Sequence, residues 1–183
     1  TIKQKVINPT KKEFDFYTYG QIIRKEIPDI SNFYILHEGL IATLDEELIE
    51  EDYDDIQEEK FSRTSQKGWL GISDKFWITS LIPPKGKEFK TTFDYKDKFR
   101  ANFVGTEPLE LKGNSSIEDK LQVIVAAKRV DIIDGYAESL NIDKFDLAID
   151  WGIMYFITKP LWASRHLNGV AAGVRASGWF TKN

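Results

Sequence analysis

Up to about residue 128 the chain alternates apolar and polar positions in short runs, the pattern of β-strands. The clearest pair is 69–72 and 76–82, which Ser73-Asp74-Lys75 joins as a hairpin before Pro83 and Pro84 end it. Further strands are expected at 2–7, 14–23, 33–36, 40–44, 98–104, 109–111 and, best formed as a buried strand, 121–127. Short strands separated by turns predict an antiparallel β-sandwich rather than alternating β-α units.

After Lys128 the spacing of apolar residues changes. Val130, Ile133, Ala137 and Leu140 recur every three or four positions, which predicts a short amphipathic helix. The expected architecture is therefore mainly β, with helices at the C-terminal end.

Residues 145–162, FDLAIDWGIMYFITKPLW, form an unusually apolar segment. Asp143 is the expected N-cap of a helix here, and Lys159 followed by Pro160 is expected to end it. The uncharged part between Asp150 and Lys159 would be about 12 Å long, well under the ~30 Å hydrocarbon thickness of a bilayer. The residues alone leave two interpretations equally open: a helix in a membrane interface, or one buried against protein.

Ten of the fifteen residues from 45 to 59 are carboxylates. A calcium loop would need a glycine among alternating ligands, and this block has none. We therefore expect a solvated strand edge and a short helix, with no metal. Five residues can form an inward face beneath the charge: Leu44, Leu48, Ile49, Tyr53 and Ile56.

Composition limits the class of protein to which the chain can belong. A chain of 183 residues with 42% hydrophobic residues is long enough for one domain with a real core. The net charge of −4 argues against a dedicated nucleic-acid binder, and the absence of cysteine excludes disulfides, thiol catalysis and cysteine-ligated zinc. No run approaches the roughly 20 apolar residues of a spanning helix. Because the first residue is Thr1, the chain is expected to be a piece of a longer protein.

Candidate catalytic chemistry is sparse. His37 and Glu38 are neighbours, and neighbours on a strand point to opposite faces, so the preferred interpretation is a histidine whose ring is satisfied locally. Ser73 and Asp74 have no histidine nearby in sequence, and no glycine-rich phosphate loop is present. We expect no enzyme, catalytic residue, cofactor or metal. Six aromatic residues could line a ligand groove, although core packing is the commoner role: Trp69, Phe76, Trp77, Phe89, Phe93 and Tyr95.

Three collinear segments resemble a known family. They are YGQIIRKEIPDISNFYILHEGLIATL at 19–44, GWLGISDKFWITSLIP at 68–83 and VDIIDGYAESLNIDKFDLAIDWGIMYFITKPL at 130–161. With its FDLAIDWG and YFITKPL motifs, the chain resembles the periplasmic domain of the bacterial membrane-protein insertase YidC, in an alphaproteobacterial form, over about residues 1–162.

The resemblance implies a partial antiparallel β-supersandwich, related in shape to the galactose mutarotases, on the periplasmic side of the inner membrane. It implies a scaffold and docking surface that aids insertion of inner-membrane proteins. The implied partners are the lipid surface, accessory subunits of the Sec translocon and nascent membrane proteins. For residues 145–159, the resemblance also favours an interfacial amphipathic helix over a helix buried against protein. The implied membrane or partner contacts are Phe145, Ile149, Trp151, Ile153, Tyr155, Phe156 and Lys159.

The expected division is a C-terminal portion of the sandwich at 1–142, the interfacial helix at 143–162 and a divergent, disordered tail at 163–183. Full family members carry transmembrane helices that this sequence lacks, and missing N-terminal strands would leave exposed sheet edges. Two alternatives stand beside this interpretation. One is a carbohydrate-binding or sugar-epimerase-like supersandwich, which needs a histidine and a carboxylate converging in a cleft. The other is a secreted β-sandwich adhesin.

Overall fold

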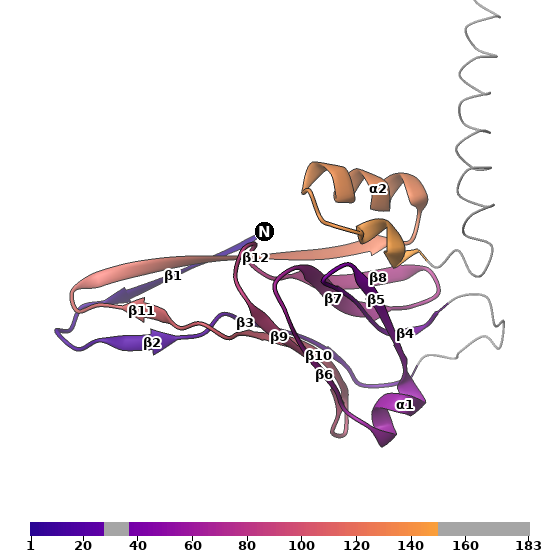
Figure 1. The fold of residues 1–183 in the computed structure, drawn as a ribbon, viewed down its shortest axis with the longest axis horizontal. Coiled ribbons are helices and arrows are strands. Elements are labelled where there is room, and N and C mark those ends of the chain that lie inside the picture. Colours follow the sequence, from indigo (N-terminus) through magenta and orange to yellow (C-terminus); the bar gives the residue numbers. More distant parts are fainter. Residues whose placement is uncertain (28–36, 150–183) are drawn as a thin grey trace, which may run out of the picture. The chain divides into compact units, whose positions relative to one another are not determined.

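Antiparallel strands carry the fold of the computed structural model, which describes residues 1–27 and 37–149 (Figure 1). The described strands are β1 (Ile2–Asn8), β2 (Phe14–Phe16), β3 (Tyr19–Arg24), β4 (Gly39–Leu44), β5 (Glu47–Asp52), β6 (Phe61–Ser65), β7 (Gly68–Ser73), β8 (Trp77–Ile82), β9 (Phe89–Tyr95), β10 (Phe99–Gly105), β11 (Leu109–Leu111) and β12 (Ser115–Ala127). The helices among these residues are α1 (Tyr53–Glu58), α2 (Val130–Ser139) and the 3₁₀ helix η1 (Phe145–Ala148).

The strands form three antiparallel sheets. The six-stranded sheet has the order β1-β12-β8-β7-β4-β5, the four-stranded sheet β3-β10-β9-β6, and a two-stranded ribbon joins β11 to β2. The predicted hairpin is confirmed as β7 and β8, with Leu70 opposite Leu81. A mainly β, antiparallel sandwich is therefore confirmed.

One apolar core lies between the two larger sheets. The six-stranded sheet contributes Leu40, Leu70 and Leu81, and the four-stranded sheet contributes Phe93 and Phe103, all within 3% of complete burial. Alternate residues of each strand face this layer, as the two-residue period of a strand requires.

A second core covers the opposite face of the six-stranded sheet. The predicted helix is confirmed as α2, whose Ile133 is fully buried against this face. Phe145 of η1 packs edge-on against Trp69 of β7, with ring centroids 5.1 Å apart. Lys85 Nζ donates a hydrogen bond to the Asn141 carbonyl at 2.5 Å, which ties the loop after β8 to the chain just past α2. The central strands of the large sheet are thus covered on both faces.

The acidic block folds as expected into an edge strand, β5, and the short helix α1. Tyr53 and Ile56 face the core, while the carboxylates face water. The two-residue turn before β5 places Asp45 and Glu46 at positive φ. Asp45 Oδ1 accepts hydrogen bonds from two backbone N–H groups of the β6–β7 turn, so the two turns support each other.

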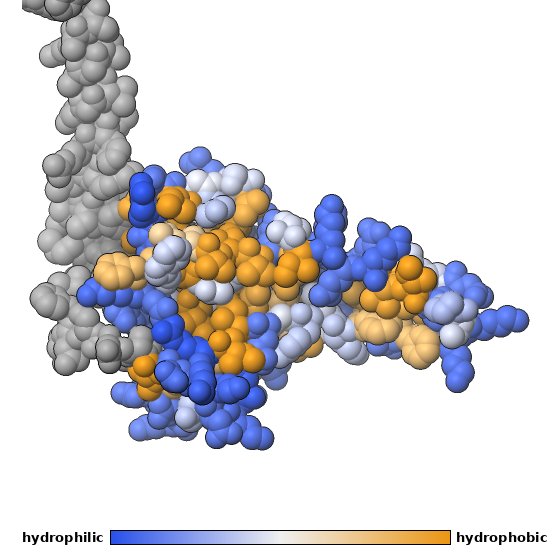
Figure 2. Space-filling view, turned by 180° about the vertical axis from the view of Figure 1, so that it is seen from behind, coloured by the Kyte–Doolittle hydropathy of each residue, from blue (hydrophilic) through white to orange (hydrophobic). Residues whose placement is uncertain are grey.

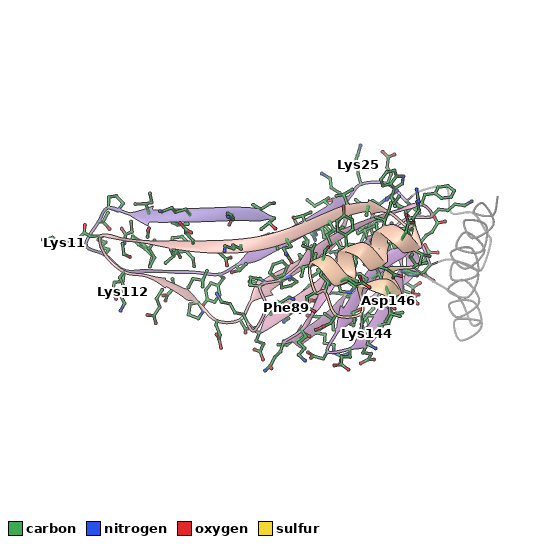
Figure 3. All side chains as sticks on the ribbon, turned by 90° about the horizontal axis from the view of Figure 1, so that it is seen from above. Lys11, Lys25, Phe89, Lys112, Lys144 and Asp146 are labelled. Carbon is green, nitrogen blue, oxygen red and sulfur yellow. The ribbon has the colours of Figure 1, made fainter. Side chains whose placement is uncertain are left out.

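The longest strand, β12, changes partner along its length. Its first half pairs with β1, from Asn8↔Ser115 to Ile2↔Leu121, and its second half pairs with β8. The first half, β1 and the β2–β11 ribbon form an arm that extends from the sandwich, with Lys11 and Lys112 at its tip (Figure 3). The stretch 14–23, expected as one strand, is two strands because the chain passes from the arm into the sandwich. Between the two strands, the Thr18 hydroxyl donates a hydrogen bond to the Asp119 carboxylate of β12 at 2.7 Å.

Candidate interaction surfaces

The predicted contact residues fall partly within the described chain. Phe145 is 0% exposed and belongs to the second core, so its side chain packs on Trp69 and is not on an outer surface. Ile149 is partly buried against the same core. The other five, Trp151, Ile153, Tyr155, Phe156 and Lys159, lie outside the described residues, as does the expected strand at 33–36.

The start of the predicted C-terminal helix needs correction. The chain forms the 3₁₀ turn η1 at Phe145–Ala148, and its N-cap position is Lys144 in the left-handed region, with φ 56°. Asp143 therefore does not cap this turn. The physical reason is the tight reversal after α2, in which Asn141 also has positive φ, and which brings Phe145 onto Trp69. Figure 3 shows Lys144 and Asp146 close to α2.

The turn between β7 and β8 carries the most exposed aromatic side chains of the described chain. Phe76 is 65% exposed and Trp77 57% exposed, and Val125 of β12 is 63% exposed. Val125 pairs with Thr79, and Trp77 pairs with Ala127, so Val125 and Trp77 are diagonal neighbours on one face. That face is the one whose next residues, Leu81 and Val123, enter the first core. On β12, the apolar residues of this face therefore continue from Val123 at the core through Val125 to Ala127, opposite Trp77.

The arm presents a second exposed apolar set: Ile2, Val6, Ile7, Phe14 and Phe16. Strand β1 pairs only with β12 among the described strands, so its other edge offers unpaired backbone groups. Seen from behind, hydrophobic residues gather in the middle of the described unit and again along the arm (Figure 2).

A polar cluster lies beneath the β7–β8 turn. Arg24 Nη1 of β3 donates to both carboxylate oxygens of Asp74, at 2.5 and 2.6 Å. Burial is the largest single effect and acts to lower the pKa of Arg24, but the hydrogen bond to Asp74 and the charges of Tyr53, Asp74 and Glu38 together raise that pKa. Burial raises the pKa of Tyr53 to about 12, although Arg24 acts in the opposite direction. This phenol is therefore neutral at physiological pH, and the cluster is a structural anchor for the turn.

Both ring nitrogens of His37 have partners close by. His37 Nδ1 lies 3.4 Å from Asp52, and its Nε2 lies 3.2 Å from the Leu40 carbonyl, so its ring is satisfied locally, as predicted. A cleft of about 430 Å³ is lined by neither His37 nor Glu38. It lies between the loop after β8 and the chain after α2, with Lys85 and Asp143 among its lining residues.

The six aromatic residues do not share a groove. Phe89 and Phe93 are buried in the first core and Trp69 in the second, on the opposite face of the sheet. Phe76, Trp77 and Tyr95 are exposed.

Residues 1–27 and 37–149 contain no cluster of three or more potential metal ligands. No helix in the same ranges is long and apolar enough to span a bilayer.

Comparison with known proteins identifies the family. Residues 1–163 match the model of the YidC periplasmic domain. The chain is 70% identical over 161 residues to the membrane protein insertase YidC of Pelagibacter ubique, covering 88% of this chain and 29% of that protein. It is 38% identical over 168 residues to the YidC of Rickettsia typhi and 36% identical to that of Rickettsia rickettsii, with 88% of this chain and 30% of each relative covered. The chain thus spans about three tenths of the length of these relatives. The antiparallel sandwich and these matches together place the chain in the family of YidC periplasmic domains.

Proposed function

We propose that this chain is the membrane-proximal periplasmic scaffold of a membrane protein insertase in the bacterial inner membrane. The relatives are named membrane protein insertases, and the family model is a periplasmic domain. In this proposal the chain performs no catalysis: it holds the insertase at the bilayer surface and offers surfaces to its partners.

The observation that carries the proposal is the run of residues that follows Ile149. The packed unit ends there, and eight uncharged residues, 151–158, then separate Asp150 from Lys159. A segment of this length cannot span a bilayer, yet its tryptophan, tyrosine and phenylalanine are the side chains that favour the interface. We infer that Trp151, Ile153, Tyr155 and Phe156 contact lipid, with Lys159 near the headgroups.

Partner binding is the second part of the proposal. The outer edge of β1 suits a partner that adds a strand, because main-chain hydrogen bonds give affinity with little side-chain specificity. The partners we propose are nascent membrane proteins and accessory subunits of the Sec translocon.

The test is co-sedimentation of the full chain with vesicles. Phe156→Asp is expected to weaken vesicle binding at least tenfold, because a carboxylate would have to leave water at the interface. Ile7→Asp is the matched control: it adds the same charge at a residue that is 67% exposed on the arm, and should leave binding unchanged. Equal binding by Phe156→Asp and the unaltered chain would refute membrane docking. Thermal unfolding of both variants checks that the sandwich is intact.

A further inference from the structure

The β7–β8 turn combines exposed aromatic side chains with a fixed backbone. Phe76 and Trp77 are both more than half exposed. The Asp74 N–H donates to the Trp77 carbonyl at 2.8 Å, which closes the turn, and the Lys128 N–H donates to the Phe76 carbonyl at 2.8 Å. Arg24 of β3 also donates to Asp74. The turn is therefore held by contacts from β3 and from the residue that follows β12. Two aromatic side chains kept in water by a rigid turn indicate a surface that is covered in use.

A lysine lies beside the exposed aromatic residues of the turn. Lys75 Nζ lies 5.4 Å from the centre of the Phe76 ring. Among the described residues near the turn, three carboxylates pair with a base: Asp74 with Arg24, Asp131 with Arg129, and Glu26 with Lys25.

The position of the turn agrees with a bilayer as the covering surface. In Figure 1 the β7–β8 turn lies at the end of the six-stranded sheet where the coloured ribbon stops after η1. If the chain after Ile149 meets lipid, as proposed above, this end of the sandwich is the one next to the membrane. Aromatic residues flanked by lysine suit the boundary of apolar chains and anionic headgroups.

We propose that the β7–β8 turn is a second membrane contact, in which Phe76 and Trp77 enter the interface and Lys75 binds anionic headgroups. This inference rests on the proposed function, because it requires the sandwich to be next to the bilayer. Two separate contacts would also fix the orientation of the sandwich on the membrane, which a single contact would not.

The direct test uses the absence of cysteine from the chain. Phe76→Cys in the full chain is labelled with an environment-sensitive fluorophore and mixed with vesicles of phosphatidylethanolamine and phosphatidylglycerol. Ile7→Cys, labelled in the same way, is the control on the arm. We expect a blue shift and increased emission at position 76 and no change at position 7. Unchanged emission at 76 in protein that sediments with the vesicles would overturn the inference while leaving the proposed function intact. Failure of the unlabelled chain to sediment would overturn both.

Binding strength gives a second readout. Phe76→Ser is expected to weaken vesicle binding about tenfold, since part of a phenylalanine side chain would no longer leave water, and Ile7→Ser should have no effect. Lys75→Gln should weaken binding about fivefold to anionic vesicles and leave binding to purely zwitterionic vesicles unchanged. Loss of binding to both kinds of vesicle by Lys75→Gln would contradict the role given to its charge. Wild-type binding by Phe76→Ser would overturn the aromatic contact.

Discussion

Replacing Phe145 by alanine separates a core role for this residue from the membrane role that the sequence resemblance implied. The side chain is completely buried, and its ring meets Trp69 edge-on at 5.1 Å. A buried phenylalanine shortened to alanine costs about 3–5 kcal/mol, in which the lost transfer energy and the cavity left behind are combined. The edge-on pair with Trp69 places Phe145→Ala toward the upper half of that range, because such pairs contribute about 0.5–1.5 kcal/mol beyond burial.

The assay is urea unfolding followed by near-ultraviolet circular dichroism, which reports the packing of the tryptophan and phenylalanine rings. A loss of 3–5 kcal/mol corresponds to a melting temperature lower by roughly 10 °C for a domain of this size. Phe76→Ala is the matched control, because it removes the same side chain where it is 65% exposed, and should change stability by no more than about 0.5 kcal/mol. If Phe145→Ala and Phe76→Ala lowered stability equally, the second core would not depend on η1 and the reasoning would be refuted.

Two further predictions concern the backbone and the buried phenol. A Cβ at Gly68, which has φ +136°, would lie 1.8 Å from the Thr43 carbonyl oxygen, so Gly68→Ala should cost about 3 kcal/mol or more in urea unfolding. Gly86→Ala, with positive φ but open space around it, should cost no more than about 1 kcal/mol, and similar losses for both would contradict the steric argument. Because burial raises the pKa of Tyr53 to about 12, its stabilising contribution is complete below pH ~10 and is lost as pH rises from about 10 to 12. Tyr53→Phe should reduce the fall in unfolding free energy over this range by about 2 kcal/mol, and an unchanged slope would show that other groups cause it.

Local pattern predicted the elements whose signal is contained within one segment. The β7–β8 hairpin has turn residues between two apolar runs, and α2 has a 3.6-residue period that no strand shares. The first half of β12 was missed because its residues before Leu121 are mostly polar, and they read as a continuation of the turn. Their strand conformation comes from pairing with β1, which lies at the other end of the described chain.

The candidate surfaces were predictable only in part. The apolar character of the chain from Phe145 onward is visible in the sequence, but the local pattern does not decide whether each ring is buried or exposed. Phe145 is buried because Trp69, far away in sequence, faces it across the second core. Phe76 and Trp77 were candidates for a groove, and their exposure follows from the four-stranded sheet ending at β3, so that nothing described covers the end of β8.

The partner exchange along β12 has a consequence for the order in which the chain can assemble. Strands β7 and β8 are synthesised before β12. They can form a hairpin at once, because only a short turn separates them. The other edge of β8 stays unpaired until the residues of β12 are synthesised. Strand β1 stays unpaired for the same time, because β12 is its only described neighbour. During that interval two strand edges are open to wrong pairing, so early translation arrest should yield aggregation-prone intermediates rather than a smaller folded domain.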